Sequence, residues 1–267
     1  MAASARLATT YEELAFVALS HVPIPASAGA IARAAQLRPA RCASLQAAGQ
    51  VFREDRPALG ALAASGILGC QHLPRLFRDL AELRATGGRG LADLGPGDVA
   101  RPEALRALRS GDARLAELLF CGMQLAAPRM AAGEPAEADL DALRRALDAL
   151  GARAPGLAAA GAVVRTCALG TSGRVYRDGA TPEIYVGGAL AADEAALLAL
   201  HELLVALSGA PHGPAERAAL DAATELVRGS PFAAGHAARL AGLDLRELPA
   251  SAEVSAVTAA LVARVGR

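Results

Sequence analysis

The sequence contains no tryptophan and no lysine, and aromatic residues make up only 3% of it. Hydrophobic residues nevertheless account for 53% of the 267 residues, so the core has to be built from leucine, valine and alanine. This composition favours closely packed helices, arranged as one large domain or two small ones. The basic residues are all arginine, which we attribute to the codon bias of a GC-rich genome of bacterial type.

The chain also lacks net charge, because 27 basic residues balance 27 acidic ones. No net field therefore draws it to nucleic acid or to an anionic membrane. No apolar run reaches about 18 residues without a charge, a glycine or a proline, so no transmembrane helix is predicted. The first ten residues lack the order of a signal peptide. No cysteine belongs to a CxxC pair, so we expect core thiols in a cytoplasmic protein: Cys42, Cys70, Cys121 and Cys167.

Residues 1–130 are predicted to form a helical region. Thr10 and Glu13 fit a capping box at the start of an apolar helix. Residues 73–83 fit an amphipathic helix with leucines at helical spacing. Three arginines on or beside this helix are expected to form a solvated face: Arg75, Arg78 and Arg84. Residues 87–97 carry five glycines and one proline and are predicted to be a linker.

Residues 26–50 offer an alternative role for this region. They fit two short helices joined by a turn, which would suit a helix-turn-helix DNA-binding regulator. The second of these helices presents only Arg41 to a phosphate or a base. Ordinary packing of two helices is the preferred interpretation, and nucleic acid is not the expected partner.

Residues 131–267 are predicted to form an α+β domain inside a mainly α protein. A leucine-striped helix over 140–150 precedes three short β-type segments at 162–167, 174–177 and 183–186. The turns between them, at 170–173 and 178–179, predict a small antiparallel sheet. The helices expected after the sheet span 193–208, 214–228, 231–240 and 252–264.

His201 and Glu202 lie on the first of these helices and are the leading candidate site. In a zincin, two histidines four residues apart on one helix bind Zn²⁺, and the glutamate after the first histidine polarises the attacking water. Residues 184–190, 197–203 and 217–223 follow one another as an edge strand, a metal-binding helix and a third-ligand helix would. In this order the region resembles the soluble heat-shock and CAAX-prenyl-protease type of zinc metallopeptidase.

The chain departs from that family's pattern at two ligands. Val205 occupies the position of the second histidine, and Arg217 occupies that of the ligand glutamate. Asp221 matches the aspartate that supports the family's site. Glu216 is expected to lie about 100° round the helix from Arg217, on the wrong face for a ligand. We expect Glu202 and Arg217 to form an ion pair in place of the metal.

The resemblance therefore implies a degenerate zincin-like domain in which His201, Glu202 and Asp221 are relics. The leading interpretation is a non-catalytic pseudo-metallopeptidase that binds a protein partner as a scaffold, adaptor or regulatory subunit. No cofactor and no membrane are expected. The alternative enzyme is an active zinc metallopeptidase with Glu202 as general base and a non-standard ligand set: His201, His212 and His236.

Overall fold

The computed structural model describes residues 4–20, 69–111, 113–129, 137–167, 173–177, 181–245, 248 and 250–266. The helix-turn-helix predicted over 26–50, with Arg41, lies outside these residues, and so does the side chain of His212. Among the described residues, no helix is both long enough and apolar enough to span a bilayer.

The first part of the chain is mainly helical, apart from one short strand. Its elements are β1 (Ser4–Leu7), α1 (Thr10–Ser20), the 3₁₀ helix η2 (Gly69–Arg75), α5 (Leu80–Ala85), η3 (Leu91–Asp93), η4 (Pro96–Asp98), α6 (Pro102–Ser110), α7 (Ala113–Ala126) and η5 (Ala127–Arg129). The helix predicted over 73–83 is thus divided between η2 and α5. Asp79 separates the two, because its carboxylate accepts hydrogen bonds from the first amides of α5.

The second part contains the other strands and the longest helices. Its elements are α8 (Glu137–Gly151), α9 (Pro155–Ala159), β2 (Val163–Cys167), β3 (Gly173–Tyr176), β4 (Glu183–Gly187), α10 (Ala192–Ser208), α11 (His212–Val227), α12 (Phe232–Ala241) and α13 (Ala252–Val265). The mainly helical α+β class is therefore confirmed.

The strands form one mixed sheet in the order β1-β2-β4-β3. Both β1 and β4 run parallel to β2, and only β3 is antiparallel to its neighbour β4. The predicted antiparallel sheet is wrong, because β4 lies between β2 and β3, and these two strands do not pair as a hairpin. Nor is β4 the edge strand that the resemblance implied. The predicted boundary between residues 130 and 131 stays a prediction, although β1 pairs with a strand beyond it.

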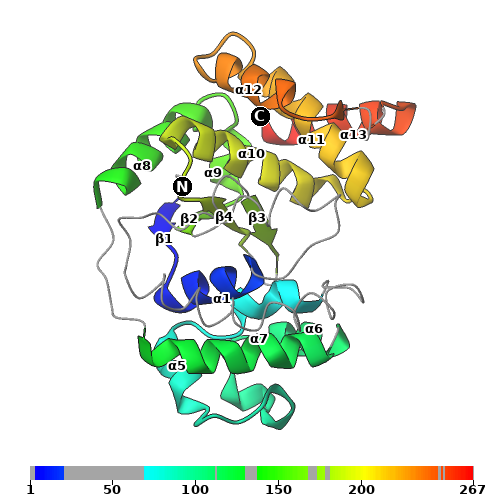
Figure 1. Cartoon of the computed structure of the whole chain (residues 1–267). Coiled ribbons are helices and arrows are strands. Elements are labelled where there is room, and N and C mark those ends of the chain that lie inside the picture. The colour runs from blue at the N-terminus through cyan, green and yellow to red at the C-terminus, as the bar shows by residue number, and fades with distance from the viewer. Residues whose placement is uncertain are drawn as a thin grey trace.

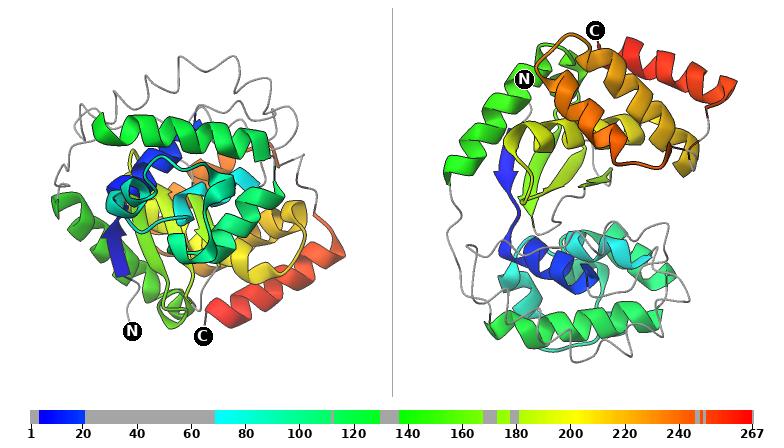
Figure 2. Two further views of the ribbon diagram at one scale, coloured as in Figure 1. Left: turned by 90° about the horizontal axis from the view of Figure 1, so that it is seen from below. Right: turned by 45° about the horizontal axis from the view of Figure 1, so that its top comes forward.

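The two faces of the sheet meet different layers, which Figure 1 and the right view of Figure 2 show above and below the strands. Ile184 and Val186 point into an apolar cluster with leucines of α8 and α10. Tyr185 points to the other face, where its ring lies 5.1 Å from that of Phe16 in α1. The sequence of β4 suits this arrangement, because apolar Ile184 and Val186 alternate with Glu183 and Tyr185. The sheet therefore carries α10 on its apolar side.

Helix α10 is the central helix of the second layer, and its predicted span of 193–208 is confirmed to within one residue. The carboxylate of Glu194 accepts a hydrogen bond from the Ala191 amide at 3.2 Å, which caps the first turn. Gly209 ends the helix with a φ of 65°. Nine residues of α10 between Ala195 and Leu204 are buried, so it packs on the sheet on one side and on α11 and α12 on the other. This places His201 inside the protein.

Candidate functional site

His201 is buried between α10 and α11, with only 4% of its surface exposed. Its Nε2 lies 2.9 Å from Oε2 of Glu216 in α11. Its Nδ1 is buried and has no hydrogen-bond partner among the residues that the structure describes. We place the ring proton on Nε2, which can donate it to Glu216. A proton on Nδ1 would instead leave a buried N–H without a partner, which costs more than leaving an acceptor nitrogen without one. The imidazole therefore donates to the Glu216 carboxylate.

Glu216, rather than Arg217, is the residue of α11 that faces His201. The expectation that Glu216 lies on the wrong face is wrong. The reason is the register of the helix pair, since a shift of one residue rotates a side chain by about 100°. The sequence alone could not show which of these two adjacent residues faces His201, because both belong to the same turn of the helix. The residue of α11 that contacts His201 is thus an acid, one residue before Arg217.

Arg217 and Asp221 lie on another face of α11 and pair with each other. Nε of Arg217 donates to both carboxylate oxygens of Asp221 at 3.1 Å, and its Nη1 donates to the Leu248 carbonyl at 2.9 Å. In the described part of the chain, no ion pair joins Glu202 to Arg217. The structure therefore does not bring Arg217 or Asp221 to His201.

Val205 follows His201 by one turn of α10. Its side chain is partly buried and packs against the apolar cluster beneath the helix. Residues at i and i+4 share one helix face, so Val205 adjoins His201 on that face. An isopropyl group has no atom that can bind a metal ion. The position that the resemblance assigns to a second histidine is therefore apolar.

Glu202 packs against the backbone of β3. A Cβ atom added to Gly173 would lie 2.8 Å from its Oε1, so any other residue there would force a neighbouring side chain to shift. Burial raises the pKa of Glu202, and the nearby Glu216 carboxylate raises it further, whereas His201, Arg174 and Arg239 lower it. The net effect is a pKa above the usual value of a glutamate, with burial as its main cause.

His236 of α12 lies beside a different turn of α11. Its Nε2 lies 3.2 Å from the carbonyl oxygen of Leu220 and 3.0 Å from Oγ1 of Thr224. Burial lowers the pKa of His236. Among the described side chains, no group of three His, Cys, Asp or Glu is arranged to hold a metal ion. The ligand set of His201, His212 and His236 stays a prediction, since it includes a side chain outside the described residues.

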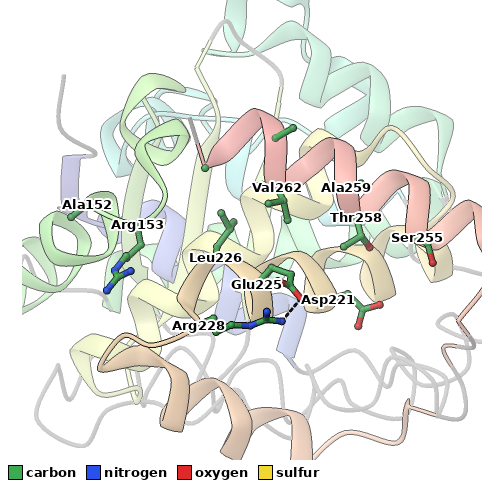
Figure 3. A pocket seen from close by; sticks show the side chains of 12 residues that line it. Ala152, Arg153, Asp221, Glu225, Leu226, Arg228, Ser255, Thr258, Ala259 and Val262 are labelled. Carbon is green, nitrogen blue, oxygen red and sulfur yellow. Dashed lines mark hydrogen bonds and ion pairs between the residues drawn. The ribbon is translucent and has the colours of Figure 1, made fainter.

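A surface groove of about 890 Å³ lies between α11 and α13. Figure 3 shows Asp221 and Glu225 on its α11 wall and Thr258 and Val262 on its α13 wall. Glu225 is already paired with Arg228, at 2.5 Å. Because Asp221 also has a partner in Arg217, both carboxylates of the groove are neutralised by the chain itself.

A second polar cluster lies under the opposite face of the sheet. Arg75 of η2 is only 2% exposed and donates to both oxygens of Glu183 in β4, at 2.8 and 3.1 Å. Arg101 and Arg165 reach the same carboxylate at 2.9 and 3.1 Å. The solvated face predicted for Arg75 is therefore wrong. Its partner lies 108 residues away, and no local pattern could indicate it.

Tyr185 extends this cluster to α1. Its hydroxyl donates to Oε1 of Glu12 at 2.5 Å and accepts a hydrogen bond from Arg75 at 2.9 Å. Burial and the Glu12 carboxylate hold the pKa of Tyr185 well above its usual range. The phenol is thus a neutral bridge between opposite charges, and the cluster joins the sheet to α1 and η2.

The histidine site on the apolar side and the arginine cluster on the polar side are therefore separated by the sheet. Only the histidine site carries residues that the sequence singled out for chemistry. Comparisons of the chain with protein-family models, with curated proteins and with solved structures find no significant match.

Proposed function

We propose that the protein is a degenerate zincin-like protein that acts by binding and not by catalysis. The observation that carries the proposal is the direct pair between His201 and Glu216, beside Val205. In the zincin arrangement, the first histidine and the ligand glutamate come from successive helices, as these two residues do. The remaining position holds an apolar side chain. Two protein ligands do not make the tetrahedral site that a catalytic zinc requires.

Glu202 supports the same proposal. A zincin glutamate must accept a proton from water, which requires an ionised carboxylate. Burial and a neighbouring acid raise the pKa of Glu202, which works against its role as a base. Glu202 therefore serves packing against β3.

The proposed partner is another protein, contacted through the helical region of residues 1–130. Leu125 of α7 supports this choice, because 67% of it is exposed, in contrast to the leucines buried along the same helix. A single exposed leucine does not define an interface. It marks α7 as the first surface to test. Two alternatives remain. Retained zinc would indicate an active peptidase, and salt-dependent binding to duplex DNA would indicate a DNA-binding regulator.

The test of the zincin arrangement is to supply the missing ligand. Val205→His adds an imidazole on the face that already carries His201, next to Glu216. We expect the variant to bind one equivalent of Zn²⁺ with a dissociation constant below about 1 µM, as a site of three protein ligands should. Val205→Ala is the matched control and should bind no more zinc than the wild-type protein.

Removing His201 by His201→Ala in the Val205→His background should abolish the zinc binding. A folded Val205→His variant that binds no zinc in calorimetry would contradict the proposed arrangement. Circular dichroism of each variant separates this outcome from a loss of fold.

A further inference from the structure

The N-terminal helical layer, which comprises α1 and residues 69–129, has an apolar core of its own. Its buried side chains pack with one another, from Tyr11 in α1 to Ala127 in η5. The side chains on the other face of the sheet form a second core with the later helices, from Ala5 to Val265. Figure 1 shows the helical layer below the sheet and the later helices above it. Within the described residues, these two apolar cores are separate.

The contacts between the helical layer and the sheet, which we call the seam, are mostly polar. Glu183 of β4 binds Arg75 of η2 at 2.8 Å and Arg101, just before α6, at 2.9 Å. The hydroxyl of Tyr176 in β3 donates to the carbonyl oxygen of Gln71 at 2.6 Å. The seam is therefore held mainly by ion pairs and hydrogen bonds.

One small apolar cluster also crosses the seam. Phe16 of α1 packs there against three buried side chains of the sheet: Cys167, Tyr176 and Tyr185. This cluster is much smaller than the core on either side of it. Opening the seam therefore exposes far less apolar surface than unfolding either core, and the hydrophobic effect opposes it less.

The charges of the seam also suit a separation into water. If Arg75 and Arg101 move away with the helical layer, Glu183 keeps Arg165 of the neighbouring strand β2 at 3.1 Å. Buried charges regain their hydration when they separate, which offsets much of the attraction that is lost. Polar interfaces inside a chain resemble transient interfaces, at which relative motion is expected. The chain crosses the seam at residues 8–9, which join β1 to α1 and can act as a pivot.

We propose that the seam is a latch: the helical layer moves off the sheet as a unit, with both apolar cores intact, and the bonds of Glu183 to Arg75 and Arg101 hold it closed. The open form uncovers Tyr185 and Cys167. This inference stands on the contacts of the seam and does not depend on the function proposed above.

Two native thiols distinguish opening of the seam from unfolding. Cys167 is buried in the cluster that crosses the seam. Cys70 is the matched probe, because it is buried in the core of the helical layer and should stay buried when that layer moves off the sheet. Two full-length proteins each retain one of these thiols, with the other cysteines replaced by alanine. Their reaction with a small disulfide reagent is measured at increasing urea, below the unfolding transition, relative to the same thiol in the unfolded protein.

We expect Cys167 to react at least about tenfold faster than Cys70, at a rate that hardly changes with urea, because opening exposes little surface. The rate of Cys70 should rise with urea along the slope of global unfolding. Equal rates with equal urea slopes would overturn the latch, since the seam would then open only when the protein unfolds.

Glu183→Gln tests which contacts hold the latch closed. It should speed the reaction of Cys167 about 100-fold while the weak urea dependence persists. Arg101→Gln is a milder variant, because that side chain is 30% exposed, and it should speed the reaction about tenfold. It decides the question if circular dichroism shows that Glu183→Gln does not fold.

The matched control is Glu82→Gln, which removes an exposed pair with Arg78 inside the helical layer. It should change the reaction rate of Cys167 less than about threefold. Folded Glu183→Gln or Arg101→Gln proteins in which Cys167 reacts no faster than in this control would overturn the role assigned to the Glu183 bonds.

Discussion

Removing the charge of Glu183 is the most demanding test of how the sheet is joined to the N-terminal helices. The substitution Glu183→Gln preserves the shape of the side chain. It leaves three guanidinium groups around a neutral amide: Arg75, Arg101 and Arg165. Arg75 is the most affected of these, because only 2% of its side chain is exposed and water cannot replace the lost carboxylate.

The magnitude follows from the ionisation of Glu183. Burial acts to raise its pKa, but the hydrogen bonds and charges of the arginines outweigh burial and lower the pKa from 4.5 to about 2. A difference of that size corresponds to about 3 kcal/mol of stabilisation of the ionised form. Removing one partner of a buried ion pair typically costs about 3–5 kcal/mol. We therefore expect Glu183→Gln to lower the free energy of unfolding by about 3 kcal/mol at neutral pH.

The assay is equilibrium unfolding in urea, followed by circular dichroism at several pH values. The folded-state pKa of Glu183 lies below its ordinary value of 4.5. Its stabilisation is therefore complete above pH 4.5 and is lost as the pH falls through about 2. The difference between wild type and variant should be constant near neutral pH and should shrink below pH 4.5.

The control is Glu82→Gln, which removes an ion pair with Arg78, a residue whose side chain is 77% exposed. This change should cost no more than about 0.5–1 kcal/mol. A loss below about 1 kcal/mol for Glu183→Gln, comparable to the control, would refute the reasoning that the cluster is buried and coupled.

Two further predictions concern the histidine side of the sheet. Gly173→Ala should destabilise the protein by about 1–3 kcal/mol in the same urea assay, because its Cβ would lie 2.8 Å from Oε1 of Glu202 and 2.9 Å from Cγ of Leu198. Gly97→Ala, where nothing lies within 4 Å of the added atom, should be neutral, and equal losses at the two sites would contradict the packing described for β3. His236→Gln should make stability less dependent on pH: burial lowers the pKa of His236 below 6.5, so the stability it contributes is present above pH 6.5 and is lost as the pH falls. Parallel stability curves of wild type and variant between about pH 7 and pH 5.5 would show that the folded protein accepts this proton freely.

The local patterns of the sequence predicted most of the second half of the fold. The acidic first turn, Asp193 and Glu194, and the following Gly209 mark both ends of α10, and the alternation around Tyr185 indicates which side chains of β4 share a face. These features depend on neighbours within a few residues. They are the kind of information that a single sequence contains.

Pairing between distant segments was missed for a physical reason. Ser4–Leu7 is too short to show a strand pattern, and it is held in place by β2, which begins at Val163. The order of β2, β4 and β3 was missed because turn residues predict a reversal of the chain, not which strand will pair with which. The partner of β1 and the order of the other three strands are both properties of the assembled sheet.

The candidate site was predicted in part. His201 and its apolar neighbour Val205 were found from their spacing on one helix. The partner Glu216 was assigned to the wrong face, because the relative rotation of two packed helices depends on side-chain contacts along their whole length.

The zinc content of the wild-type protein tests the central claim most directly. The protein, without a histidine tag, is equilibrated with Zn²⁺, dialysed extensively and analysed for metal by mass spectrometry. Our account predicts retained zinc far below one equivalent, because Val205 leaves the pair of His201 and Glu216 without a third ligand. Retention of about one equivalent, lost in His201→Ala, would contradict the account and identify the protein as a zinc-binding protein.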